Sequence, residues 1–170
     1  MDSLPQMRLR ALEPEDLDDL YLIENDRELW DVGVTNVPYS RYVLHEYLST
    51  MTGDIFADRQ LRLVVENGSG DMVGLVDLCN FDPRHRRAEV GIVVRRGFRG
   101  RGYAHAALRH LESYAREVVH LHQMYAFVGR GNAGSLRLFE AAGFRCAAEI
   151  ADWLYDGAGY ESVVLLQCFL

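Results

Sequence analysis

The sequence predicts an α+β fold, with a mixed, largely antiparallel central sheet flanked by about four helices. Two observations support this fold class. Short apolar runs rich in β-branched residues follow one another through the middle of the chain and again at its end, separated by turns of Asn, Gly, Asp and Pro. Longer segments with apolar residues three and four positions apart lie before and between these runs. The 170 residues, 49% of them hydrophobic, are the size of one domain, and we expect a single domain over residues 1–170.

The first elements are a short strand and two helices. Residues 7–11 alternate between apolar and polar side chains, which predicts a strand. Pro14 then opens a helix whose acidic first turn complements the positive end of the helix dipole. Residues 39–51 have the spacing of a second helix, which Gly53 ends. Between the helices, residues 26–38 contain Gly, Asn and Pro and predict a loop that packs over the domain.

Three strands and a long helix follow. Residues 61–66 and 72–79 predict a hairpin around an Asn-Gly-Ser-Gly turn. Residues 87–94 form the next predicted strand, which is rich in valine and ends in a loop of glycine and arginine. Beyond this loop, alanine and leucine at helical spacing predict a helix over residues 102–118.

The chain closes with three strands and one helix. Residues 124–128 predict a strand, and residues 132–142 predict a helix with an Asn at its N-cap and a Gly after its end. Residues 144–150 and 160–169 predict two final strands, joined by a turn at Asp156.

Composition narrows the classes of function. The formal net charge of −7 argues against general nucleic-acid binding and suits a cationic small substrate. No stretch approaches the roughly 18 apolar residues of a membrane span, and the first residues do not resemble a signal peptide. We therefore expect a cytoplasmic protein that does not bind membranes. The three cysteines and six histidines have no spacing typical of a metal site, so no metal is expected, and a homo-oligomer is left open.

The segment 95–104 has the features of a phosphate-binding loop. Its three glycines allow positive φ and close approach of a ligand, and its four arginines add positive charge. The first N–H groups of the helix that follows have no partner within the helix and favour an anion. A structural turn with a solvated basic rim would give a similar pattern. No Gly-Lys-Ser/Thr ends this loop, which excludes the nucleoside-triphosphate P-loop, and the glycine spacing excludes the Gly-x-Gly-x-x-Gly dinucleotide loop.

Two motifs give a resemblance to a known family. Residues 99–104, Arg-Gly-Arg-Gly-Tyr-Ala, match Arg/Gln-x-x-Gly-x-Gly/Ala, the cofactor motif of the GNAT acyl-CoA N-acyltransferase superfamily. Residues 132–144 resemble that family's Asn-x-x-Ser-x-x-Leu-Tyr-x-x-x-Gly-Phe helix. Residues 74–78, Gly-Leu-Val-Asp-Leu, and residues 85–89, His-Arg-Arg-Ala-Glu, look like the spermidine and diamine N-acetyltransferases. The ribosomal-protein N-terminal acetyltransferases share much of this pattern, and the resemblance covers nearly the whole chain.

The resemblance implies a GNAT-like domain with acetyl-CoA as its co-substrate. It also implies an enzyme, an N-acetyltransferase that moves the acetyl group to a primary amine, with a polyamine or diamine as the first expectation. The alternatives are a protein N-terminal acetyltransferase of the ribosomal-protein type and a non-catalytic acyl-CoA-binding module. The positions that match the family's cofactor contacts are Ile92, Val93, Val94, Arg99, Gly100, Arg101, Gly102, Tyr103, Ala104, Asn132 and Phe139.

Glu89 is the candidate catalytic base. An alkylammonium must lose a proton before its nitrogen can attack a thioester. Glu89 begins the strand that leads to the cofactor loop, and we expect it near the place where amine and thioester meet. An ion pair with Arg86 or Arg87 would give it a structural role instead. Asp77, in the neighbouring apolar strand, is expected either to help Glu89 bind a cationic substrate or to be a paired structural group.

Two further steps of the reaction need a partner group. The oxyanion on the thioester carbonyl needs a donor, and the resemblance implies a backbone N–H at Val93 or Val94. The family's tyrosine, which gives the departing thiolate a proton, is replaced here by Phe139. The proton is then expected from water, Tyr103, Tyr125 or another group, unless the protein is a weak catalyst. Phe139 itself either packs against the cofactor or belongs to the core.

The acceptor amine is expected near the first two helices. The aromatic residues of this region either line its pocket or belong to the core, and they are Trp30, Tyr39, Tyr42 and Tyr47. Residues 34–38 are uncharged where the spermidine enzymes have glutamates, which counts against a polyamine.

Overall fold

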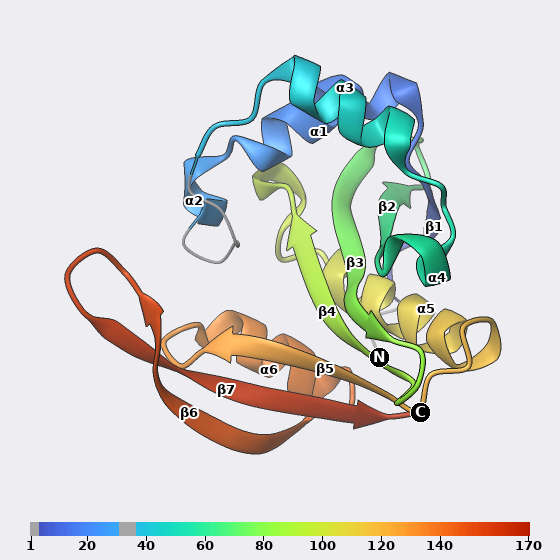
Figure 1. Ribbon diagram of the computed structural model, residues 1–170. Coiled ribbons are helices and arrows are strands. Elements are labelled where there is room, and N and C mark those ends of the chain that lie inside the picture. The colour runs from blue at the N-terminus through green and yellow to red at the C-terminus, as the bar shows by residue number, and fades with distance from the viewer. Residues whose placement is uncertain (1–3, 31–36) are drawn as a thin grey trace.

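Seven strands form one mixed sheet in the computed structural model, which describes residues 4–30 and 37–170 (Figure 1). The order across the sheet is β1-β2-β3-β4-β5-β7-β6. All neighbouring strands pair antiparallel except β4 and β5, which are parallel. The strands are β1 (Met7–Ala11), β2 (Leu61–Asn67), β3 (Met72–Asp82), β4 (Arg87–Val94), β5 (Gln123–Gly129), β6 (Arg145–Tyr155) and β7 (Tyr160–Phe169). The predicted α+β class with a mostly antiparallel sheet is confirmed.

Helices cover both faces of this sheet. Leu20 of α1 packs with Leu75 of β3, whereas Leu111 of α5 packs with Val76, the next residue of the same strand. Since successive side chains of a strand point to opposite faces, α1 and α5 lie on opposite sides of β3. The helical segments are η1 (Pro14–Asp16), α1 (Leu17–Glu24), α2 (Arg27–Trp30), α3 (Arg41–Thr50), α4 (Ile55–Asp58), η2 (Arg96–Phe98), α5 (Tyr103–Glu117) and α6 (Ala133–Ala141).

Two short helices were not predicted. The expected loop over residues 26–38 contains α2, which Asp26 starts by accepting the Glu28 N–H at 3.1 Å. The rest of that segment, residues 31–36, lies outside the described residues. After the predicted end of α3, Asp54 caps α4 and accepts the Phe56 N–H at 2.9 Å. Each of these helices begins at a single aspartate and has only one turn. One turn is too short for apolar residues to recur at helical spacing, so the sequence pattern did not predict these helices.

Two strands run beyond their predicted ends. β3 continues to Asp82 and β6 to Tyr155, and each contains a register shift. Asn80 and Asp152, both with φ of 50°, lie at these shifts. A β-bulge inserts extra residues into one strand and lets the pairing resume beyond it, so the sequence interruption does not end the strand.

An ion-pair network joins β1 to its neighbours. Arg10 lies between Asp16 and Glu66, at 2.7 Å from Asp16 Oδ2. Its guanidinium holds the pKa of Asp16 below the usual value of 3.8. A carboxyl group with a lowered pKa adds stability above its unfolded-state pKa, and this stability is lost as the pH falls through the folded-state pKa.

We expect Asp16→Asn to lower the free energy of unfolding by about 1–3 kcal/mol at neutral pH, because Arg10 then lacks one of its charged partners. The difference from the wild type should shrink as the pH falls below 3.8, where the wild-type carboxyl also begins to lose its charge. Urea titrations of the wild type and the variant measure the free energy of unfolding at neutral and at acidic pH. A destabilisation that is the same at both would contradict the ion-pair account.

Candidate functional site

A split in the sheet is the main feature of the site. β4 and β5 pair only over residues 87–89 and 123–125, so the pairing ends at Glu89 and Tyr125. Beyond this point β4 continues to Val94 beside β3, while β5 diverges from it (Figure 1). Within the described part of the chain, the edge of β4 that faces β5 therefore has no strand partner over its last residues. Such an edge offers a row of backbone hydrogen-bonding groups to an elongated ligand.

The backbone of β4 directs its donors alternately to the two sides. Arg95 donates its N–H to the Val73 carbonyl at 2.9 Å, so Val93, two residues earlier, also faces β3. The N–H groups of Ile92 and Val94 then point to the open edge. By this alternation, Ile92 and Val94 are better placed than Val93 to donate to a ligand in the split.

Charged groups gather on the face of β3 and β4 that α1 and α3 cover. Asp77 accepts two hydrogen bonds from Arg62 of β2, at 2.8 and 3.0 Å, and Arg62 also donates to Glu24 of α1 at 2.6 Å. Burial alone would lower the pKa of Arg62, but Asp77 and Glu24 raise that pKa above its usual range. The Tyr47 ring lies 5.8 Å from the guanidinium carbon, and burial raises the pKa of its hydroxyl. Asp77 is thus in an ion pair, one of the two roles expected for it.

Glu89 is half-buried at the point where the sheet splits. Asn80 donates its side-chain amide to Glu89 Oε2 at 2.7 Å. The two arginines considered as ion-pair partners bond elsewhere, because Arg86 donates to a backbone carbonyl and Arg87 lies against an aspartate. Among the described residues, Glu89 therefore forms no ion pair with either arginine, and its carboxylate accepts a hydrogen bond from the Asn80 amide.

Two weak acids flank Glu89. Cys79 is its register partner on β3, and burial together with the charge of Glu89 raises the pKa of the thiol to about 12. Tyr125 is its register partner on β5, where burial and then the charge of Glu89 raise the pKa of the hydroxyl. Both groups are therefore protonated at neutral pH. Tyr125 also lies where the pairing of β4 and β5 ends.

The loop between β4 and α5 has the backbone geometry of an anion cradle. Gly100 and Gly102 have φ of 71° and 83°, in the left-handed region that favours glycine. α5 begins at Tyr103, and Ala106 is the residue whose N–H bonds the Gly102 carbonyl. The N–H groups of the first helical turn thus have no acceptor within the helix, and they lie at the positive end of its dipole. This arrangement fits a phosphate or pyrophosphate.

Three arginines of this loop contact Glu28 of the neighbouring helix α2 or the loop itself, and Arg95 forms an ion pair with Asp19 of α1 at 3.0 Å. Arg99 donates to the Val94 carbonyl at 2.9 Å and lies 3.7 Å from Glu28 of α2. Arg96 lies 3.0 Å from the same carboxylate, and Arg101 lies over a phenylalanine ring. Exposed ion pairs of this kind contribute little stability, so an incoming phosphate can replace them at low cost.

The second motif forms α6. Asn132 caps this helix by accepting the Ser135 N–H at 3.0 Å. Phe139 is 4% exposed and packs edge-to-face on Phe144, with ring centres 5.0 Å apart. Phe139 thus belongs to the hydrophobic core, one of the two roles expected for it.

The aromatic residues expected near the acceptor have different environments. Tyr39 and Tyr47 pack against the core between α1, α3 and the sheet, whereas Tyr42 is 68% exposed. The side chain of Trp30 lies outside the described residues, as does most of the uncharged stretch 34–38.

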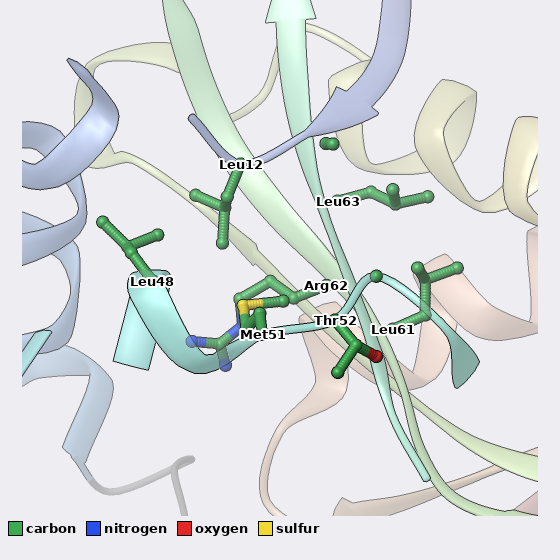
Figure 2. Close-up of a pocket in the computed structure, with 9 residues that line it drawn as sticks. Leu12, Leu48, Met51, Thr52, Leu61, Arg62 and Leu63 are labelled. Atoms are coloured by element: carbon green, nitrogen blue, oxygen red, sulfur yellow. The ribbon is translucent and has the colours of Figure 1, made fainter. Parts of the chain in front are cut away.

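Two cavities lie beside these elements. One, of about 210 Å³, is bounded by β1, β2 and the end of α3 and is mostly apolar, with Arg62 in its wall (Figure 2). The other, of about 300 Å³, lies between α1, α2 and the loop that joins β4 to α5, and Arg95 and Arg96 line it. In the described part of the chain, neither cavity is lined by Glu89.

Sequence reasoning missed three side chains of the site, Arg62, Glu24 and Asn80. The signal for Arg62 was incomplete, because the hairpin turn pairs Glu66 with Met72, and only a register shift between Val65 and Glu66 then places Arg62 opposite Asp77. Glu24 gave no such signal, since its position depends on how α1 packs across the sheet. Among residues 4–30 and 37–170, no cluster of three metal-ligating side chains and no helix able to cross a membrane is found.

Residues 6–145 match the family model described as the acetyltransferase (GNAT) domain. The chain is 27% identical to the spermidine N(1)-acetyltransferase of Vibrio cholerae over 158 residues, which are 93% of this chain and 90% of that protein. It is 29% identical to YdaF of Bacillus subtilis, a candidate ribosomal N-acetyltransferase, over 92% of this chain and 87% of that protein. The crystal structure of spermidine N-acetyltransferase from Vibrio cholerae in complex with CoA and spermine is similar with a TM-score of 0.86 and 26% identity, over 96% of this chain and 95% of that one.

Proposed function

The chain belongs to the acetyltransferase (GNAT) domain family and is an acetyl-CoA-dependent N-acetyltransferase, for which we propose a polyamine or diamine acceptor. The observation that supports this acceptor most is the charge beside the split. Arg62 bonds both Glu24 and Asp77, and Glu89, two residues before the register partner of Asp77, adds a third carboxylate on the same face. An acceptor with more than one ammonium group matches this excess of negative charge. The spermidine acetyltransferases to which the chain is similar support the same class of acceptor.

Acetyl-CoA supplies the acetyl group as a thioester, and we propose how this chain binds it. The anion cradle at the start of α5, residues 99–104, takes the pyrophosphate. The open edge of β4, residues 92–94, takes the pantetheine arm through its backbone. α6, which follows β5, is proposed for the opposite wall, with Asn132 at its N-terminus beside the cofactor and the buried Phe139 supporting the wall from the core. The free donors of the β4 edge and the glycines of the cradle support this orientation.

Glu89 is proposed to take the proton of the acceptor ammonium, directly or through one water. The amine nitrogen then attacks the thioester carbonyl, and the N–H groups of Ile92 and Val94 stabilise the negative charge that develops on its oxygen. The C–S bond breaks, and the departing thiolate receives a proton from Tyr125. The nitrogen passes its second proton to the Tyr125 oxygen, directly or through one water, as the amide forms, and Glu89 returns its proton to solvent. The Tyr125 hydroxyl is protonated at neutral pH, and its position beside Glu89 supports the assignment.

We expect Tyr125→Phe to lower kcat by roughly 10–100-fold, because the thiolate then loses its proton donor while the ring is kept. Phe139→Tyr is the comparison, since it restores the hydroxyl that the family has at that position. In this chain that hydroxyl would enter the core, so the variant should lose about 1–3 kcal/mol of stability and gain little activity. A large gain in kcat from Phe139→Tyr, with no loss from Tyr125→Phe, would contradict the role of Tyr125.

The proposed acceptor is tested with a panel of amines and the release of free CoA thiol. The panel contains putrescine, spermidine, spermine, an aminoglycoside and peptides with free N-termini. We expect the diamine and the polyamines to give the highest kcat/KM. Turnover of a peptide alone would instead support protein N-terminal acetylation, the candidate favoured by the similarity to YdaF. Silence across the panel, with acetyl-CoA still bound, would indicate a non-catalytic acyl-CoA-binding module.

A further inference from the structure

A row of aromatic rings extends from Glu89 across the open face of β5. Tyr125, the register partner of Glu89, lies edge-to-face with Phe127, with ring centres 5.8 Å apart. Phe127 in turn stacks on Trp153, with ring centres 5.9 Å apart and ring planes at 18°. Phe127 is 36% exposed and Trp153 is 55% exposed. These three side chains, Tyr125, Phe127 and Trp153, are called the aromatic shelf below.

The shelf lies on the same side of the sheet as the candidate base. Met124, Ala126 and Val128 of β5 point into the core. The alternate residues, Tyr125 and Phe127, therefore point away from it. Residues in register on neighbouring strands share a face, so Glu89 points to the same side as Tyr125.

A β-bulge brings Trp153 to this face. β6 is not a neighbour of β5, because β7 lies between them (Figure 1). The register of β6 against β7 shifts between Ile150 and Leu154, and Asp152 within the shift has φ of 50°. A bulge re-aims the side chains beside it, and here Trp153 reaches across β7 to stack on Phe127. A non-glycine residue at positive φ costs conformational energy. At Asp152 this strained backbone precedes a tryptophan whose side chain is only half-buried.

The chemistry of the shelf favours a cation. The face of an aromatic ring carries partial negative charge, and tryptophan attracts ammonium groups most strongly of the three ring types. A carboxylate lies at the inner end of the row, since Glu89 adjoins Tyr125. The protein as a whole has a net charge of −7. An aryl group or an apolar partner would use the rings but not these charges.

We propose that the aromatic shelf is the subsite for the distal ammonium group of a diamine or polyamine whose reacting amine lies at Glu89. This inference rests on the proposed function. The spacing between successive rings, 5.8 and 5.9 Å, is one that a propyl or butyl spacer between two amine nitrogens can follow, so the second ammonium group of a diamine reaches the first rings and the terminal ammonium group of a triamine reaches Trp153. Trp153 is thus a specificity-determining residue, which selects acceptors by their terminal charge and takes no part in the chemistry.

The test compares amines that differ only in the distal charge. Spermidine and N-butyl-1,3-diaminopropane have the same chain of carbons and inner amines, but only spermidine has an ammonium group at the end of the butyl chain. Trp153→Leu removes the aromatic face and keeps an apolar side chain, whereas Trp153→Phe keeps a ring. Tyr160→Leu is the matched control, because Tyr160 is 67% exposed in the same hairpin and its ring lies against Tyr155, outside the shelf. Melting temperatures check that each variant is folded.

We expect Trp153→Leu to raise KM for spermidine by roughly 5- to 30-fold with kcat unchanged, and to leave N-butyl-1,3-diaminopropane unaffected. Trp153→Phe should restore most of the loss, and Tyr160→Leu should match the wild type. Calorimetric titration of spermidine into the CoA complex should show the same weakening without any turnover. An equal effect on N-butyl-1,3-diaminopropane, no effect on spermidine, or an effect confined to an aryl amine such as phenethylamine would overturn the proposal. A Trp153→Leu variant with a changed sedimentation coefficient and an unchanged KM would also overturn it, because Trp153 would then belong to an interface between copies of the chain.

The two proposals fail separately in this experiment. If the wild type acetylates spermidine and Trp153→Leu does so with unchanged KM, the subsite is wrong and the proposed function stands. If the wild type acetylates no amine but its spermidine binding depends on Trp153, the proposed function is wrong and the subsite stands.

Discussion

A Glu89→Gln variant is expected to lose turnover by ~10²–10⁴-fold while its affinity for acetyl-CoA hardly changes. Glutamine cannot accept the proton of the acceptor ammonium at any pH used. It can still accept the hydrogen bond that Asn80 gives to Glu89 Oε2 at 2.7 Å, so the side chain keeps its place. The loss then reports the missing base and not a rearranged site.

The measurement is kcat for the best amine across the pH range, together with calorimetric titration of acetyl-CoA. Glu112→Gln is the matched control, since Glu112 lies on α5 in ion pairs with Arg109 and Arg116, away from the split. It should keep wild-type turnover. A Glu89→Gln variant that acetylates the best amine as fast as the wild type at every pH would exclude Glu89 as the base.

Gly102→Asp is expected to weaken acetyl-CoA binding by at least about 100-fold. Gly102 has φ of 83°, and a Cβ there would lie 3.1 Å from Pro5 Cδ, so any side chain strains the cradle. The carboxylate also places negative charge at the helix N-terminus that is proposed to bind the pyrophosphate. Calorimetric titration with acetyl-CoA measures the loss.

Two variants separate strain from charge in this prediction. Gly102→Ala adds the strain without the charge and should cost less affinity than Gly102→Asp. Gly53→Asp makes the same change at another positive-φ glycine, with φ of 75° and nothing near its added Cβ, in the turn between α3 and α4. It should bind acetyl-CoA like the wild type. Unchanged affinity in Gly102→Asp would contradict the assignment of the cradle.

The elements proposed to bind acetyl-CoA were predictable as a strand, a loop and a helix because they are contiguous in the chain. The valine-rich strand β4, the glycine and arginine loop and α5 follow one another, so local patterns were sufficient to order them. The backbone orientation within β4 was not predictable in the same way. The N–H groups of β4 that point into the split are those that do not bond to β3. Only the hydrogen bond from the Arg95 N–H to the Val73 carbonyl, seen in the structure, shows which ones these are.

The acceptor side depends on contacts between distant residues, and sequence patterns did not provide them. Only the ion pair of Asp77 with Arg62, fifteen positions away, decides between the two roles left open for Asp77. Arg62 also bonds Glu24, which lies on α1 and not in the sheet. The extension of β6 to Tyr155 followed from a bulge at Asp152, a residue type that usually indicates a turn. Without that bulge, the stacking of Trp153 on Phe127 could not be anticipated.

Mass spectrometry of the products tests the central claim most directly. Purified protein is incubated with acetyl-CoA and spermidine, and both the amine and the CoA are analysed over time. We expect one acetyl group to appear on spermidine for each free CoA formed, and neither product to form without the protein. Free CoA without acetylated amine, or acetylation of peptides but not of spermidine, would contradict the assignment of this chain as a polyamine N-acetyltransferase.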